Sequence, residues 1–175
     1  MTSLLSNTNQ NQAELALEWM LSRANDPRKM PFGKLLSEHT TIIEGIARSR
    51  IEIDAARLMA LNAAHTIDET DAKTALKEIA EIKVLIPAMA LPVIDRAVQS
   101  FGGEGISQKT PLAYMWAQAR VLRLADGPDE VHIQQLGRRE NKRGPEMLKK
   151  IQRQSEIADR LFLKYGKDTA WIARL

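Results

Sequence analysis

Helical periodicity along almost the whole length is the feature that most constrains the fold of this 175-residue chain. Apolar residues recur every three or four positions over 34–67 and again over 71–100, which predicts two long amphipathic helices. Alternating strand-like runs and Asn-Gly hairpin turns are missing from the sequence. The pattern therefore predicts an all-α protein.

Proline and glycine punctuation divides the rest of the chain into further helices. We expect a helix over Gln12–Ala24, a helix that begins with Thr110 as its cap, another from Pro128 and a last one from Pro145. Pro87 and Pro92 fall inside the helix over 71–100, where they predict a kink or local unwinding rather than a break. Short loops between long helices indicate antiparallel neighbours, so we expect an up-and-down helical bundle.

The same pattern predicts the domain organisation. Residues 1–11 are polar and are expected to form a flexible leader, residues 12–142 the bundle, and residues 143–175 an additional helix and a tail. In the second long helix, Ile43, Ile51, Leu58 and Leu61 widen the apolar stripe beyond one face. An apolar surface this wide predicts a central position in the bundle and a homo-oligomer, either a dimer or a tetramer.

Composition excludes several classes of protein. The chain has no cysteine, so it has no disulfide framework or thiolate metal site, and we expect a cytoplasmic location. No apolar run reaches the length of a membrane span, and no secretory signal is present, so no membrane partner is expected. Segment 138–153 holds seven basic and two acidic residues. Without interleaved aromatic residues, it is interpreted as a solvated face rather than a nucleic-acid site.

Few residues have a setting in which they could carry chemistry. P-loop, Rossmann, HExxH and GxSxG patterns are absent, and the three histidines are far apart, so no metal site is expected. Asp126 lies in "ADGPDEVH", between two predicted helices, where the turn can direct its carboxylate into a cleft. It is therefore a candidate general base. The alternative is a cap on the helix that begins at Pro128.

Three stretches resemble the C-terminal helical domain of acyl-CoA dehydrogenases. They are "RKMPFGKLLSEH" (Arg28–His39), "IDRAVQSFGGEG" (Ile94–Gly105) and "ARVLRLADGPDEVHIQQLGRRE" (Ala119–Glu140). The resemblance runs colinearly over about 13–140, and "ADGPDEVH" is similar to the branch whose base turn reads aspartate–glycine–proline. The sequence shows no counterpart of the N-terminal helical domain or the middle β domain of that family.

The resemblance implies roles for particular residues. Asp126 would remove the proton α to a thioester, and FAD would accept a hydride from the β carbon. Contacts to the FAD of a neighbouring subunit are implied for Arg28, Phe32, Gln99, Gly102 and Gly103. Arg28 lies four residues before Phe32, whereas the family arginine often stands three before, at the position of Lys29.

Three functions remain open at this point. The first is a flavin-free isomerase or cyclase that acts on an apolar small molecule, for example in secondary metabolism. In this interpretation Asp126 is the catalytic residue, and Met115 and Trp116 line the substrate site. The second is an acyl-CoA dehydrogenase fragment or subunit that needs FAD and the missing domains. The third is a non-catalytic oligomerisation module. We expect the isolated chain to bind no cofactor.

Overall fold

The computed structural model describes residues 2–165 of the chain. Six α-helices occur in this range: α1 Thr2–Ala24, α2 Thr40–Glu69, α3 Leu76–Phe101, α4 Leu112–Leu122, α5 Asp129–Asn141 and α6 Gly144–Tyr165. Three short 3-10 turns cover Pro31–Gly33, Leu36–Glu38 and Gly102–Glu104. The described residues contain no strand, and the all-α prediction is confirmed.

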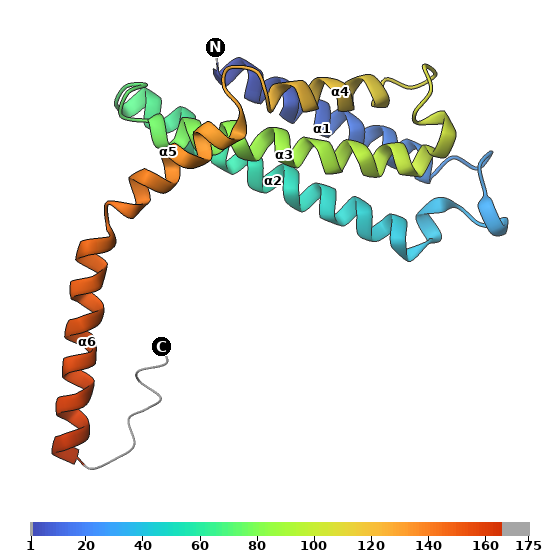
Figure 1. Ribbon diagram of the computed structural model, residues 1–175. Helices are drawn as coiled ribbons and strands as arrows, with labels where there is room; N and C mark the ends of the chain where they lie inside the picture. Colours follow the sequence, from blue (N-terminus) through green and yellow to red (C-terminus); the bar gives the residue numbers. More distant parts are fainter. Residues whose placement is uncertain (1, 166–175) are drawn as a thin grey trace. The chain divides into compact units, whose positions relative to one another are not determined.

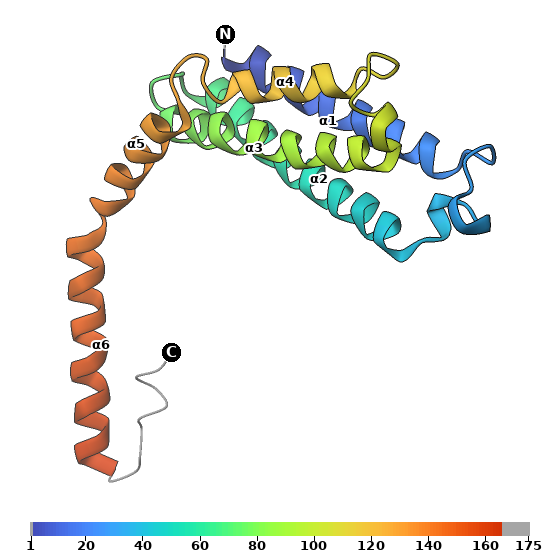
Figure 2. The same cartoon turned by 45° about the vertical axis from the view of Figure 1, so that its right-hand side comes forward.

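The chain divides into two compact units, one up to Gln134 and one from Gln135. In the first unit, α1, α2, α3 and α4 lie side by side as an up-and-down bundle (Figures 1 and 2). In the second unit, α6 is an amphipathic helix without a buried residue. The sequence pattern placed the end of the bundle later, at Lys142.

Helix α3 is the centre of the bundle, and it packs against α1, α2 and α4. It carries the largest share of the core, with fully buried residues Ile86, Ala90, Ile94 and Ala97. Pro87 and Pro92 lie within it without ending the helix. The segment Leu76–Glu104 is long and apolar enough to cross a membrane by length and composition. Half of its apolar window is buried inside the bundle, as in the core helix of a globular domain.

Helix α1 begins at Thr2 rather than at the expected Gln12, so much of the segment interpreted as a leader is helical. Asn9 and Gln10 are buried despite being polar, which is why apolar periodicity did not reveal this part of the helix. Leu21 is exposed because it lies to one side of the buried stripe. That stripe consists of Ala13, Ala16, Leu17, Met20 and Ala24.

Helix α2 buries one face only. The buried residues are Ser49, Ile53, Ala56 and Ala63. The exposed apolar residues are Ile43, Ile51, Leu58 and Leu61. The expected wide apolar surface of α2 is therefore present, and part of it remains uncovered in the single chain. The central position predicted for this helix belongs to α3 instead.

Charged side chains connect α2 to both of its neighbours. Glu14 on α1 accepts hydrogen bonds from Arg50, at 2.8 Å, and from Arg57. Arg96 on α3 pairs with Glu52 at 2.6 Å. The hydrogen bond from Arg50 holds the pKa of Glu14 below its usual value of 4.5. These contacts set the register of α2 against the bundle.

Candidate functional site

The turn between α4 and α5 presents Asp126. Asp126 and Gly127 both have positive φ angles, of 54° and 100°. A left-handed aspartate is uncommon, and two such residues in succession reverse the chain sharply. The side chain of Asp126 is exposed. Its carboxylate accepts no hydrogen bond from any residue in the described range, so the capping alternative has no bond to support it.

A second aspartate holds this turn closed. Asp129 is buried, and its Oδ2 accepts a hydrogen bond from Nε of Arg123 at 2.6 Å. The main-chain N–H of Asp129 also donates to the carbonyl of Arg123 at 3.3 Å. These two bonds between Arg123 and Asp129 form a clasp across the turn. Sequence reasoning missed this clasp, although Asp129, the second acidic residue of "ADGPDE", was a signal for it. The clasp leaves Asp126 at the apex, with its carboxylate unpaired.

The glycine-rich turn after α3 depends on two different properties of glycine. Gly102 has a φ of 63°, which strongly favours glycine. Gly105 lies so close to α3 that an added Cβ would be 2.5 Å from the carbonyl oxygen of Val98. At Gly103 an added Cβ would meet nothing within 4 Å, and Gln99 is exposed beside the turn. The outer side of this turn is therefore open to an approaching group.

Thr110 closes the loop that follows these glycines. Its hydroxyl donates a hydrogen bond to the carbonyl of Gly105 at 3.2 Å. The sequence predicted Thr110 as the cap of α4, but Pro111 holds that position and α4 begins at Leu112. Thr110 instead fixes the close approach of Gly105 to the end of α3.

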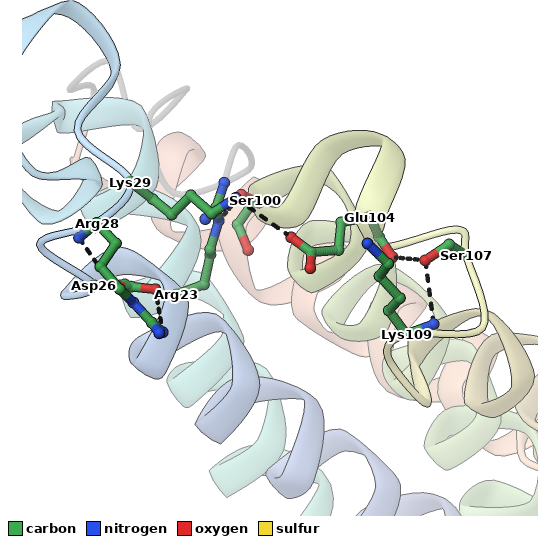
Figure 3. A network of polar contacts seen from close by, with 8 residues as sticks. All are labelled: Arg23, Asp26, Arg28, Lys29, Ser100, Glu104, Ser107 and Lys109. Atoms are coloured by element: carbon green, nitrogen blue, oxygen red, sulfur yellow. Dashed lines mark hydrogen bonds and ion pairs between the residues drawn. The ribbon is translucent and has the colours of Figure 1, made fainter.

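The loop between α1 and α2 brings a basic residue to the same glycine turn (Figure 3). Nζ of Lys29 lies 3.9 Å from a carboxylate oxygen of Glu104. Arg28 instead binds Asp26 through two nitrogens, at 2.9 and 3.0 Å, and its side chain is 85% exposed. The hydrogen bonds from Arg28 lower the pKa of Asp26 to about 2. In this chain Lys29, rather than Arg28, reaches the turn of Gly102–Glu104.

Phe32 lies on the same loop and is held in an exposed position. Its φ of 57° is unusual for a bulky residue, and its side chain is 95% exposed. The ring of His39 lies beside it, with centroids 6.3 Å apart. A strained and exposed phenylalanine is suited to contact a partner outside the single chain.

The candidate residues form two groups, one beyond each end of α4. The glycine turn precedes α4, and the turn that contains Asp126 joins α4 to α5 (Figure 1). An α-helix rises 1.5 Å per residue, so the 11 residues of α4 separate the groups by about 16 Å. The structure therefore brings Lys29 and the turn of Gly102–Glu104 into one region, with Phe32 on the same loop as Lys29, and Asp126 into another.

The two proposed lining residues do not share a face of α4. Met115 is 4% exposed and belongs to the core, whereas Trp116 is 41% exposed. Adjacent residues on a helix point about 100° apart, which explains the difference. The described residues hold no group of three or more side chains that could bind a metal ion.

The fold and these turns define an all-α helical-bundle domain. The family model of the acyl-CoA dehydrogenase C-terminal domain matches residues 6–140. Acyl-CoA dehydrogenase family member 10 of Mus musculus is 52% identical over 120 residues, which cover 69% of this chain and 11% of that protein. The probable acyl-CoA dehydrogenase FadE2 of Mycobacterium tuberculosis is 44% identical over 128 residues, which cover 73% and 31% of the two chains.

A solved structure agrees with these matches. Butyryl-CoA dehydrogenase from Megasphaera elsdenii superimposes with a TM-score of 0.72 at 26% identity, over 78% of this chain and 34% of that chain. This chain belongs to the acyl-CoA dehydrogenase family and corresponds to its C-terminal domain. It spans between about a tenth and a third of the length of the relatives described above. Helix α6 lies beyond the matched residues.

Proposed function

We propose that this chain acts as the C-terminal domain of an FAD-dependent acyl-CoA dehydrogenase, with Asp126 as the catalytic base. The observation that supports the proposal is the exposed, unpaired carboxylate on a rigid left-handed turn, at the position where the family resemblance places the base. FAD, when bound, would accept the hydride from the β carbon of the acyl thioester. Asp126 would take the proton from the α carbon.

The spacing of the two groups supports a homo-oligomer with shared sites. Asp126 would act at one flavin, and the turn of Gly102–Glu104 with Lys29 and Phe32 would contact the flavin of a neighbouring subunit. The open side of Gly103 leaves room for such a group. The exposed apolar face of α2 offers a surface through which subunits could associate.

A chimera tests this proposal. Residues 6–140, which the family model matches, would replace the corresponding segment of FadE2, and acyl-CoA-dependent reduction of an artificial electron acceptor would be measured. Removal of a general base costs about 10²–10⁴ in rate, so Asp126→Asn should lower kcat by that factor. Because asparagine tolerates left-handed φ, FAD content and melting temperature should stay unchanged. A flavin-loaded chimera that turns over equally well with Asn at position 126 would exclude Asp126 as the base.

A flavin-free isomerase or cyclase is a second proposal, in which Trp116 would line the site for an apolar substrate. It is favoured by α6, which is an addition beyond the matched domain. The two proposals differ in flavin dependence. A substrate isomerised by the isolated chain without flavin would support the second, whereas activity only in the FAD-containing chimera would support the first. A cytoplasmic location without nucleic-acid or membrane partners stays a prediction for both.

A further inference from the structure

Lys83 is a buried lysine within the bundle. It lies on α3, and only 3% of its surface is exposed. Lysine is seldom buried without compensation, because removing an ammonium group from water costs a large free energy. Its partners therefore show what the protein gains from it. Neither the sequence pattern nor the candidate site accounts for this residue.

The ammonium group of Lys83 binds the end of α4. Nζ donates one hydrogen bond to the carbonyl of Leu122 at 3.0 Å and another to the carbonyl of Ala125. Within the described part of the chain, Lys83 forms no ion pair with a carboxylate. The last carbonyls of a helix lack partners within the helix and carry partial negative charge, so a cation is well placed there.

These contacts bear directly on the base turn, because Ala125 immediately precedes Asp126. On the other side, the clasp between Arg123 and Asp129 ties the two ends of the turn together. The residues that flank Asp126 are thus held by both sets of contacts, while its carboxylate remains free. A left-handed aspartate persists only where its surroundings enforce the conformation.

We propose that Lys83 is a positioning residue for Asp126. It fixes the last turn of α4 and so directs the carboxylate of Asp126, without itself touching substrate or flavin. This inference rests on the proposed function only for its effect on catalysis. The anchoring of the turn can be tested in the isolated chain.

The first experiment measures amide hydrogen exchange in the full chain. The N–H groups of Leu124 and Ala125 bond to the carbonyl of Val121 at 2.9 and 3.0 Å, so they report on the end of α4. Because hydrogen bonds from a charged group are lost, Lys83→Met should speed their exchange about tenfold or more. Lys77→Met is the control, since Lys77 lies on the same helix but, among the described residues, pairs only with Glu78 and Glu81. It should leave both exchange rates unchanged.

A chemical rescue covers the case in which Lys83→Met does not fold. The chain has no cysteine, so Lys83→Cys creates a single thiol. Alkylation of the unfolded variant with 2-bromoethylamine joins an aminoethyl group to that sulfur, releases bromide and restores an ammonium group at nearly the length of lysine. Refolding and slow exchange only after alkylation would support the proposal. Equal exchange with and without the restored ammonium group would overturn it.

The second experiment uses the chimera with FadE2. A displaced base lowers the rate about tenfold to a hundredfold, so Lys83→Met should reduce kcat by that factor and leave KM nearly unchanged. When Asp126 is already replaced by Asn, Lys83→Met should cause no further loss of kcat. A general structural defect would instead reduce kcat again. An inactive chimera with unchanged Lys83 and Asp126 would refute the proposed function. The exchange rates would still decide whether Lys83 holds the turn.

Discussion

Gly105 approaches Val98 so closely that a Cβ on the glycine would lie 2.5 Å from the carbonyl oxygen of the valine and 2.9 Å from its Cα. This contact packs the turn against the last part of α3, and the hydroxyl of Thr110 donates a hydrogen bond to the carbonyl of Gly105. Backbone atoms cannot move aside as a flexible side chain can. This position therefore requires glycine for space rather than for its φ angle.

We expect Gly105→Ala to lower the free energy of unfolding by about 2 kcal/mol, because the new methyl group overpacks the turn. Gly103→Ala is the matched control, since a Cβ there meets no atom within 4 Å. It should change the stability by less than about 0.5 kcal/mol. Urea unfolding followed by circular dichroism measures both. Equal stabilities for the two variants would contradict the close packing of Gly105.

Strain at the turn of Asp126 and Gly127 gives a second prediction. Gly127 has a φ of 100°, and a Cβ there would lie 3.4 Å from Nε2 of His132. We expect Gly127→Ala to cost about 1–3 kcal/mol in thermal unfolding, because alanine rarely adopts this conformation. Gly33→Ala introduces similar strain at a φ of 78° with no neighbour within 4 Å. Only Gly127→Ala should shift the NMR signals of the His132 ring.

The pair of Glu14 and Arg50 predicts a dependence of stability on pH. The hydrogen bond from Arg50 lowers the pKa of Glu14 in the folded chain below its usual 4.5. A lowered pKa stabilises the fold above the unfolded value, and this contribution is lost as the pH falls through the folded value. Glu14→Gln should therefore be less stable than the wild type at pH 7, by about 1 kcal/mol or less.

The same difference should shrink as the pH falls below 4.5 and vanish once Glu14 is protonated in both states. Urea midpoints at pH 7, 5 and 3 measure it. Glu44→Gln serves as the control, because Glu44 forms an exposed pair with Arg48 within α2 and connects no two helices. A stability difference for Glu14→Gln that stays constant from pH 7 to pH 3 would show that the charge of Glu14 is not responsible.

The uncovered face of α2 predicts the oligomeric state. Leu58 is 68% exposed on this face, together with Ile51. We expect the wild-type chain to sediment as an oligomer and Leu58→Lys to sediment as a smaller species with the same helical content, because the charge disrupts an apolar interface. Ile106→Lys changes an equally exposed residue in a loop and should leave the mass unchanged. A monomeric wild type at micromolar concentration would refute this prediction.

Much of the fold could be predicted from the sequence because it depends on local patterns. Apolar spacing over 34–67 and 71–100 indicated the two long helices, and "ADGPDEVH" identified a sharp turn between helices. The family resemblance came from the same short stretches, and the family model confirmed it. Such signals depend on residues that are near neighbours along the chain. They fail where buried residues are polar, as at Asn9 in α1.

Only the tertiary structure decided which residues each face meets. The sequence gives no sign that Lys83 is buried, because its partners lie far along the chain, Leu122 at the end of α4 and Ala125 in the turn that follows. It also does not distinguish Gly105, which packs on Val98, from Gly103, which faces open space. Burial and close approach depend on the position of a second helix. A helical period specifies which residues share a face, whereas packing against neighbouring helices determines which face is covered.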